Sequence, residues 1–407
     1  MNQKFLLIVS ICSLILLTSC WNRIELNELA IVVGMGIDYD DGKFIVTAQV
    51  VNPGEIAAYQ GSGGNSPVVV YQEKGNTLFE AIRRITTVSP RKLYFSHLRL
   101  LVYGEELAKK GLGKSLDFLS RDPEIRTDFY VAIAKNSKAG DILKVLTAME
   151  KIPAQQLFES LLASEKAWAP TMPITMDQLN LDLIGEGINA KLTGIMRMGN
   201  VQTGEKLEDL QQSKPATILK YDAIGVFRKD QLVGWLTEDE SKGLNHALGN
   251  VKSTVVTIPC PEKGTANIEL NQTNSELKTE VLGHKSKGRI KVVLKGNVGG
   301  VQCKTLDLSK QETMRFLEIK TEKEIQQNIF KALHASQKEY KVDPFGFGEA
   351  ARRSNPKVWH LIKNDWIQIF EKMPVEVKVT VKIHDLGMIK NSPLNKIKKY
   401  PAIQNQQ

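Results

Sequence analysis

The sequence has few of the side chains that catalytic and metal sites use. Its six histidines are dispersed without metal-ligand spacing, at His97, His246, His284, His334, His360 and His384. It contains neither the HExxH pattern of zinc peptidases nor the GxSxG elbow of serine hydrolases, which excludes those two classes. Paired carboxylates from distant parts of the chain stay open as a possibility. We expect no metal site, no cofactor and no catalytic residue.

A complete nucleotide-binding loop is also missing. Residues Ala108–Ser115 fit a phosphate-loop pattern with alanine in place of its first glycine. A working loop follows a buried strand, whereas the preceding Glu105–Ala108 has a helical composition, so we interpret the match as chance. Gly34 and Gly36 begin a dinucleotide fingerprint, but Tyr39 stands where its third glycine belongs.

One long apolar run is present, at Phe5–Leu17, and no later run approaches the length that spans a bilayer. This run has the length of a signal-peptide core. The stretch Leu17-Thr18-Ser19-Cys20 resembles a bacterial lipobox. The resemblance implies that residues 1–19 are a signal peptide and that Cys20 becomes a lipid-modified N-terminus anchored by two or more acyl chains. An ordinary secretory signal with a chance cysteine is the alternative.

Cysteine is scarce, with four in 407 residues. Cys12 would leave with the signal and Cys20 would carry lipid, which leaves Cys260 and Cys303. A disulfide between these two would persist in an exported protein, but the sequence does not show whether they meet. Two separate buried thiols are the alternative.

The net charge is modestly positive, at +9, and the cations are spread along the chain. This balance suits a body that lies near an anionic membrane surface. Nucleic acid is not the expected partner, because the chain is exported and its cations form no large patch. The densest cluster lies within Asn395–Tyr400, and we interpret it as a solvated tail.

Mixed strand and helix signals predict an N-terminal α+β domain over residues 20–187. Two strands, over residues 31–38 and 44–51, flank a turn at Asp40–Gly42. Thr77 with Glu80 has the capping-box pattern, and Pro153 precedes a predicted helix. Further strands are expected at residues 68–71, 98–103 and 129–134, and helices at residues 112–120, 141–148 and 154–167.

Residues 188–285 are predicted to form a connector and a β-rich middle domain, and residues 286–400 a C-terminal α+β domain. The connector is placed at 188–212, where periodic signals are few. Capping-box patterns at Thr237 and Thr321 each predict a helix start. The alternation over residues 375–384 predicts a strand with one buried face. The predicted fold class is α+β, multidomain, with mixed β-sheets flanked by helices and an N-terminal lipid anchor.

One charged stretch, one histidine and two tryptophans are the remaining candidates. We interpret RDPEIR, at Arg121–Arg126, as a turn with local ion pairs; a docking edge or an anion site is the alternative. His97 precedes a predicted strand and is expected to be a hydrogen-bonded core histidine rather than a ligand. Trp359 and Trp366 are expected to anchor the core from one helix.

The stretch from Cys20 to Asp38, CWNRIELNELAIVVGMGID, resembles the opening of the Ger(x)C family of spore-germination lipoproteins. In that family a Cys-Trp pair follows the signal, and a Gly-x-Gly-Ile-Asp strand comes shortly after. Four later stretches resemble further blocks of the family and follow in the same order. They are SHLRLLVYGEELAKKGL, SRDPEIRTDFYVAIAK, AIGVFRKDQLVGWLTEDESKGL and DPFGFG. The resemblance covers almost all of the chain from Cys20 to about Gly387.

The resemblance implies a three-domain α+β protein with no established enzymatic activity, the C subunit of a nutrient germinant receptor. Its place would be the outer face of the inner spore membrane, and its partners two polytopic membrane subunits, A and B. The one residue role implied is lipid attachment at Cys20.

Two other classes are weighed against it. A solute-binding lipoprotein of an importer has two α/β lobes about a hinge, which the β-rich stretch over residues 221–298 disfavours. An envelope enzyme would need a cleft with convergent titrating groups.

Overall fold

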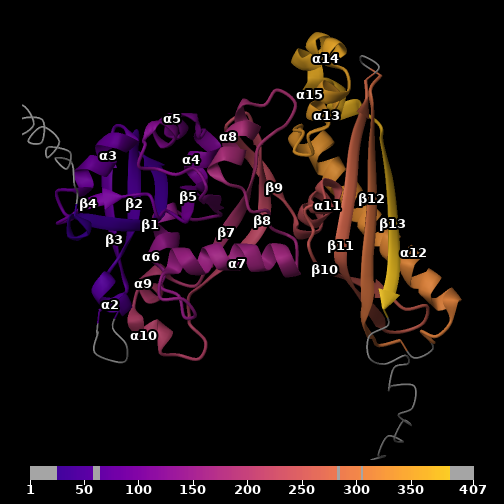
Figure 1. Cartoon of the computed structure of the whole chain (residues 1–407), viewed down its shortest axis with the longest axis horizontal. Helices are drawn as coiled ribbons and strands as arrows, with labels where there is room; N and C mark the ends of the chain where they lie inside the picture. The colour runs from indigo at the N-terminus through magenta and orange to yellow at the C-terminus, as the bar shows by residue number, and fades with distance from the viewer. Residues whose placement is uncertain (1–24, 58–64, 282–284, 304–305, 386–407) are drawn as a thin grey trace, which may run out of the picture.

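The computed structural model describes residues 25–57, 65–281, 285–303 and 306–385. The predicted lipidation site Cys20, His284 and the basic cluster in Asn395–Tyr400 lie outside these residues. Two sheets lie side by side along the long axis of the molecule, each with its own helices (Figure 1). The predicted fold class, α+β with mixed sheets flanked by helices, is confirmed.

The first sheet has nine strands in the order β3-β2-β1-β5-β6-β7-β8-β9, with β4 beside the start of β1. The central strands β1, β5, β6 and β7 run parallel, and antiparallel hairpins extend the sheet at both sides. The bounds are β1 (Leu29–Asp40), β2 (Lys43–Val51), β3 (Val68–Gly75), β4 (Lys92–Tyr94), β5 (Leu100–Gly104), β6 (Tyr130–Ala134), β7 (Lys191–Met198), β8 (Ile218–Arg228) and β9 (Gln231–Leu236).

Helices cover both faces of the first sheet because its central strands are apolar on both sides. On β5, Leu100 and Val102 pack in the cluster of α6 and α7, whereas Leu101 and Tyr103 pack in the cluster of α3, α4 and α5. The helices of this part are α2 (Pro53–Ala57), α3 (Leu78–Ile85), α4 (Glu105–Lys110), α5 (Gly113–Arg121), α6 (Ala139–Lys144), α7 (Pro153–Ala167), α8 (Met176–Ile184), α9 (Val201–Gly204) and α10 (Leu207–Leu210), preceded by the 3-10 turn η2 (Leu26–Glu28).

A buried carboxylate explains the Gly-x-Gly-Ile-Asp stretch of β1. Asp38 accepts hydrogen bonds from the backbone N–H groups of Ala139 (2.9 Å) and Gly140 (3.0 Å) and so holds the start of α6 against the sheet. A Cβ on Gly36 would lie 3.1 Å from the Cβ of Ala139, so glycine lets this helix approach closely. Burial raises the pKa of Asp38, and the two N–H donors oppose that rise.

The second sheet has four strands in the order β10-β11-β12-β13, with β12 and β13 parallel. The long helix α12 packs on one of its faces together with α11 (Figure 1). The elements of this part are α11 (Glu238–Leu248), β10 (Thr254–Pro259), β11 (Thr265–Glu280), β12 (Lys287–Val301), α12 (Gln311–His334), the π-helical turn η3 (Ala335–Tyr340), α13 (Phe347–Ser354), α14 (Pro356–Ile362), η4 (Lys363–Asp365), α15 (Trp366–Lys372) and β13 (Val375–Asp385).

Several local predictions are confirmed. Thr77 caps α3, and Thr237 with Glu240 forms a complete capping box on α11. The turn at Asp41-Gly42 joins β1 to β2, with positive φ at both residues, and Pro153 begins α7.

Three local predictions are wrong. The predicted connector over residues 188–212 contains β7, whose first five residues are buried on both faces and therefore lack the alternation of a half-buried strand. The long helix begins at Gln311, ten residues before the predicted start, and the hydroxyl of Thr321 instead donates within the helix to the carbonyl of Leu317 (2.8 Å). Helix α6 ends at Lys144 and not near residue 148.

The segment predicted as connector and middle domain, 188–285, supplies strands to both sheets. Strands β7, β8 and β9 complete the first sheet, and β10 and β11 begin the second. The change of sheet falls at α11, between β9 and β10, because the first sheet ends at β9.

The structure answers the question left open for the last two cysteines, since Cys260 and Cys303 form a disulfide with Cα atoms 5.7 Å apart. Cys260 directly follows β10 and Cys303 lies shortly after β12, so the bond links the ends of these two strands. The two cysteines are 43 positions apart in the sequence.

We expect the paired replacement Cys260→Ser and Cys303→Ser to lower the free energy of unfolding by about 2–4 kcal/mol, because the unfolded chain regains loop entropy. Urea unfolding measures this. A reducing agent should shift the wild-type midpoint downward and leave the variant unchanged. A wild-type midpoint that ignores reduction would contradict the prediction.

Candidate functional site

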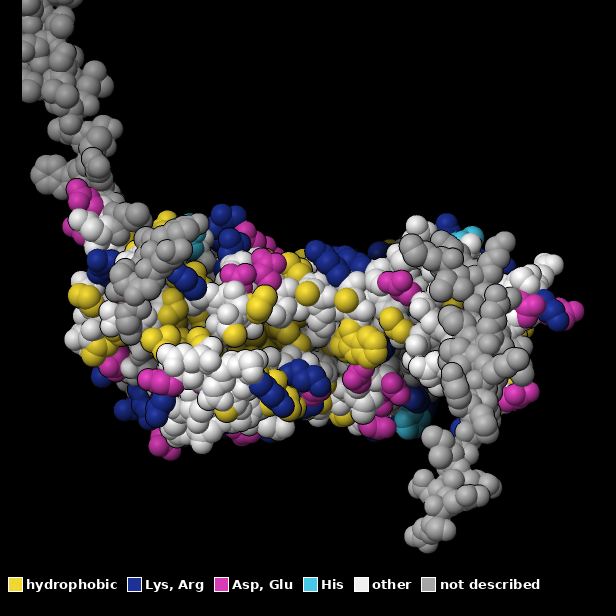
Figure 2. Space-filling model, turned by 90° about the horizontal axis from the view of Figure 1, so that it is seen from below, with side chains coloured by type: hydrophobic (Ala, Val, Ile, Leu, Met, Phe, Trp, Pro, Cys, Tyr) yellow, Lys and Arg dark blue, Asp and Glu magenta, His cyan; other side chains and the backbone are white. Residues whose placement is uncertain are grey.

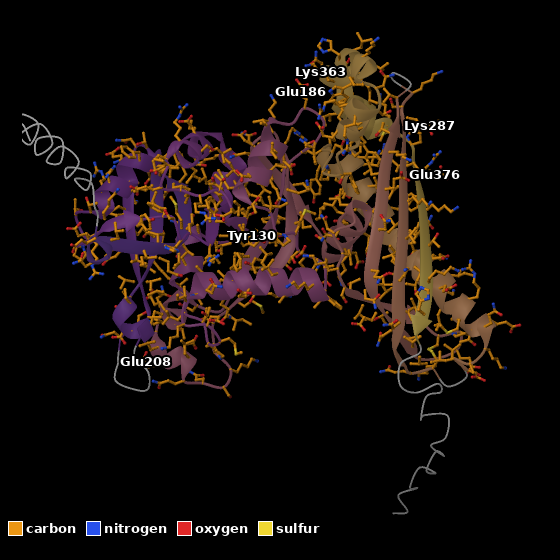
Figure 3. The ribbon with its side chains drawn as sticks, in the orientation of Figure 1. Tyr130, Glu186, Glu208, Lys287, Lys363 and Glu376 are labelled. Atoms are coloured by element: carbon orange, nitrogen blue, oxygen red, sulfur yellow. A yellow bond between two sulfur atoms is a disulfide. The ribbon has the colours of Figure 1, made fainter. Side chains whose placement is uncertain are left out.

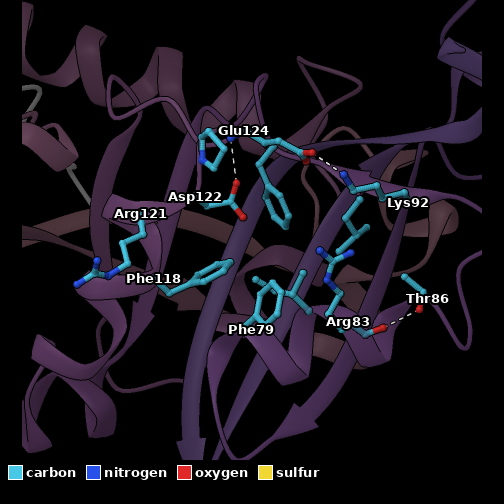
Figure 4. A pocket seen from close by; sticks show the side chains of 12 residues that line it. Phe79, Arg83, Thr86, Lys92, Phe118, Arg121, Asp122 and Glu124 are labelled. Carbon is cyan, nitrogen blue, oxygen red and sulfur yellow. Dashed lines mark hydrogen bonds and ion pairs between the residues drawn. The ribbon is translucent and has the colours of Figure 1, made fainter. Parts of the chain in front are cut away.

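A partly apolar groove of about 390 Å³ lies between α3, β4 and the turn after α5 (Figure 4). We call it the amino-terminal groove. Its volume is within the range of ligand and side-chain binding pockets. Its apolar lining is Phe79, Ile82, Leu93, Phe95, Phe118 and Pro123.

Helix α3 positions the groove through its amphipathic sequence. Leu78, Ala81, Ile82 and Ile85 form the stripe that packs on the sheet, so Phe79 is left on the outer side, 48% exposed. Its ring faces that of Phe118 at a centroid distance of 5.7 Å (Figure 4). A large aromatic side chain this exposed is typical of a contact surface.

Charged side chains form the rim of the groove. Lys92 pairs with Glu124, and Arg121 pairs with Asp117 at 2.9 Å (Figure 4 shows the first pair). Arg83 lies 4.9 Å from the centre of the Phe79 ring and has no carboxylate partner among the described residues.

The RDPEIR stretch forms one wall of this groove. It is a turn, as predicted, in which a carboxylate oxygen of Asp122 accepts the backbone N–H of Glu124 at 2.9 Å. Its charges pair with residues outside the six, as in the contacts of Arg121 with Asp117 and Arg126 with Asp128. The sequence suggested the turn, but only the fold brings it beside α3.

The groove lies where the described chain begins. Strand β4 pairs in parallel with the start of β1, and Lys92 of the groove rim is the register partner of Leu29. Leu29 follows Cys20 by nine positions, a span of at most about 30 Å of extended chain.

A second hollow, of about 330 Å³, lies between α7 and β8. Figure 2 views the molecule from below, the side on which α7 lies in Figure 1, and hydrophobic side chains gather along this face. Trp168 lies in the hollow, 44% exposed, with the ammonium of Lys242 3.4 Å from its ring centre. The hydroxyl of Tyr221 donates to the carbonyl of Leu157 at 2.8 Å.

The two sheets meet at a junction built around Asp343. Its buried carboxylate accepts three hydrogen bonds, from the N–H groups of Gly346 (2.9 Å) and Gly348 (2.9 Å) and from the indole of Trp366 (3.0 Å). Its backbone exchanges hydrogen bonds with Asn189, just before β7 of the first sheet. Burial raises the pKa of Asp343 to about 6, although the hydrogen-bond donors act to lower it.

Close backbone contact completes the junction. A Cβ on Gly187 would lie 2.4 Å from the carbonyl carbon of Gly348, so neither residue has room for a side chain. The ion pair of Glu186 with Lys363, at 2.8 Å, crosses the same boundary (Figure 3 labels both residues). Trp359 and Trp366 are core anchors, as predicted, with ring centroids 5.4 Å apart. They lie on two helices, α14 and α15, and not on one, because the turn η4 interrupts the predicted helix.

The remaining candidates have structural roles. The phosphate-loop pattern follows helix α4, as the sequence indicated, and the N–H of Gly113 at the start of α5 already donates to the carboxylate of Asp230 at 2.9 Å. Gly34 packs against Ala154, which leaves no cradle for a dinucleotide. In the described part of the chain, His, Cys, Asp and Glu form no cluster that could hold a metal ion, and no helix has the length and hydropathy to cross a bilayer.

The prediction for His97 is wrong. This histidine is exposed in the turn after β4, where Phe95 and Leu98 point inward and His97 between them points outward. The buried histidine is His246 on α11, and burial, assisted by Lys242, lowers its pKa to about 4. In the sequence, only the position of His246 on the inward-facing stripe of that helix could have indicated its burial.

Comparison with known proteins identifies the class. The model of the spore germination protein N-terminal domain matches residues 22–196, and that of the spore germination B3/GerAC-like C-terminal region matches residues 222–387. This chain belongs to the GerAC-like family of spore germination proteins, the family of germinant receptor C subunits that the sequence resembled.

Individual relatives agree along nearly the whole length. Spore germination protein KC of Bacillus subtilis is 30% identical over 97% of this chain and 98% of its own. Spore germination protein B3 of the same organism is 24% identical over 92% of this chain and 96% of its own. The crystal structure of the GerBC protein has the same fold, with a TM-score of 0.55 at 20% identity, covering 86% of this chain and 96% of its own.

Titration of Asp343 should make the junction pH-sensitive. Because its pKa is raised in the folded state, the folded protein binds this proton more tightly than the unfolded chain does. We expect the stability of the wild type relative to Asp343→Asn to fall by up to about 3 kcal/mol between pH 4 and pH 7 and to stay level above.

Urea unfolding of both proteins across this pH range measures the difference. Asp365→Asn, at an exposed carboxyl next to Trp366, is the control. A difference that stays constant, or rises with pH, would show that Asp343 does not titrate as described.

Proposed function

We propose that this protein is the lipid-anchored, non-enzymatic C subunit of a nutrient germinant receptor. In this proposal residues 1–19 are removed, Cys20 carries the lipid, and the body lies on the outer face of the inner spore membrane. Family membership supports the receptor role. The functional surfaces of the described residues are grooves lined by paired charges and apolar rings, which supports a role through protein contacts.

One observation carries the proposal: the amino-terminal groove lies beside the first residues of β1. A lipid on Cys20 would keep the groove within about 30 Å of the bilayer surface, where the integral membrane subunits A and B are accessible. Tethering raises the effective concentration of the groove near such partners, so even a weak contact is populated. Phe79 and the unpaired Arg83 are the side chains best placed for that contact.

The importer alternative receives no support from the geometry. A solute-binding lipoprotein closes two lobes about a hinge, which requires an open cleft between them. Here the boundary between the two sheets is packed backbone to backbone at Gly187 and Gly348.

The first test is Cys20→Ala in spores. We expect the protein to leave the membrane fraction and nutrient-triggered germination through its receptor to slow or fail, because the body is no longer held near its partners. Germination by agents that bypass nutrient receptors is the control and should stay normal. Retention in the membrane, or unchanged germination with loss of uptake of a solute, would reject the proposal.

The second test is Phe79→Asp in the full chain. A charged side chain in the amino-terminal groove should slow nutrient-triggered germination at least several-fold, while protein level and membrane attachment stay unchanged. Phe330→Asp is the matched control, because Phe330 on α12 is 45% exposed, close to the 48% of Phe79. If the two replacements slow germination equally, the amino-terminal groove is not the contact surface that the proposal describes.

A further inference from the structure

The second sheet has one face covered by helices and one face open. Along β12 the residues alternate, with Ile290, Val292 and Leu294 buried under α11 and α12 and the residues between them pointing outward. Strand β13 alternates in the same way, so outward side chains of both strands share the open face. Figure 3 labels Lys287 and Glu376 near one end of these strands.

The register of β12 with β13 brings lysines into direct opposition on this face. Lys291 is the register partner of Lys378, and Lys295 is the partner of Lys382, all four exposed. We call these four residues the lysine tetrad. Neighbouring strands are about 4.8 Å apart and four residues span about 13 Å, so the tetrad occupies a compact rectangle.

The acids near the lysine tetrad pair with other cations. Glu276 of β11 is the register partner of Lys291 and attracts it, but its ion pair is with Lys278 at 2.5 Å. Glu376 pairs with Arg289 at 3.2 Å. Lys291, Lys295 and Lys378 have no ion pair with any described residue. Lys382 reaches only Glu318, at 3.9 Å, and that carboxylate already pairs with Arg315 at 3.1 Å.

Protection of the sheet edge explains only half of the tetrad. Lysines on an edge strand prevent pairing with another chain, and β13 is an edge strand. Lys291 and Lys295, however, lie on β12, which is hydrogen-bonded to β11 on one side and β13 on the other. Like charges directly opposite one another destabilise a sheet. On its other side Lys291 faces Glu276, but Lys295 faces the uncharged Gln272. Two lysine pairs across one strand boundary therefore indicate a surface that serves a partner.

We propose that the lysine tetrad binds an acidic protein surface that carries carboxylates about 13 Å apart. The residues between the two lysine pairs are Val293 and Thr380, with no aromatic side chain to insert into a bilayer. The face also carries acids, at Glu276 and Glu376, which suits a patterned protein surface better than a uniformly anionic membrane. It belongs to the sheet farthest from β4 and the start of the described chain (Figure 1). The inference goes beyond the receptor role and does not depend on it.

The repulsion between opposed lysines can be tested through stability. Lys378→Glu replaces repulsion from Lys291 by attraction, so we expect the melting temperature in low salt to rise by about 2 °C. The gain should shrink in 0.5 M salt, where charges are screened. A melting temperature that falls would mean that the two lysines do not repel, and the inference would lose its basis.

Binding is measured on the full chain in detergent with two probes, immobilised poly-L-glutamate and phosphatidylglycerol nanodiscs. The test variant replaces all four lysines of the tetrad by glutamine. The control replaces Lys43, Lys74, Lys114 and Lys229 by glutamine, which removes the same charge. These four exposed lysines belong to the first sheet and its helices and have no ion pair with the described residues. Both variants keep the same anchor region, so a difference between them reports the open face.

We expect the test variant to lose at least tenfold in affinity for poly-L-glutamate, and the control to lose less than twofold. Nanodisc binding should be equal for the two variants. Equal loss of poly-L-glutamate binding in both variants would overturn the proposal. A selective loss of nanodisc binding in the test variant would also overturn it and assign the face to the membrane.

Discussion

The relation between the two sheets depends on the buried carboxylate of Asp343. Three N–H donors converge on it, and the backbone on either side pairs with Asn189 and packs on Gly187 of the first sheet. The contact is possible because glycines at positions 187 and 348 let two backbones touch. Side chains at either glycine would force the sheets apart. The two sheets are therefore joined by direct backbone packing and not by a free linker.

The stretches that carry the family resemblance are structural rather than reactive. Asp38 in the Gly-x-Gly-Ile-Asp strand and Asp343 in DPFGFG both accept backbone N–H groups at a place where glycines allow close packing. Asp141 lies near Asp38 and contributes to the rise of its pKa, and the buried His246 stands apart on α11. The surfaces proposed here to interact are the amino-terminal groove beside the chain start and the lysine tetrad on the other sheet.

Predictions from the local sequence were correct where the residues of one element are enough to explain why that element forms. Thr77 and Thr237 cap helices because their hydroxyls accept nearby N–H groups, and β13 alternates because one face is buried. The predictions failed where other elements of the fold bury the segment or extend it. Strand β7 is covered on both faces and shows no alternation, and Thr321 has a capping pattern inside a helix that tertiary packing extends on both sides.

The sequence by itself determined the fold class, the family and the turn at RDPEIR, because each rests on neighbours along the chain. Only the tertiary structure decided that RDPEIR faces α3 across a groove, that Cys260 meets Cys303, and that lysines of β12 and β13 oppose one another. These contacts join residues dozens of positions apart. Their geometry follows from strand order and register, which local propensity does not encode.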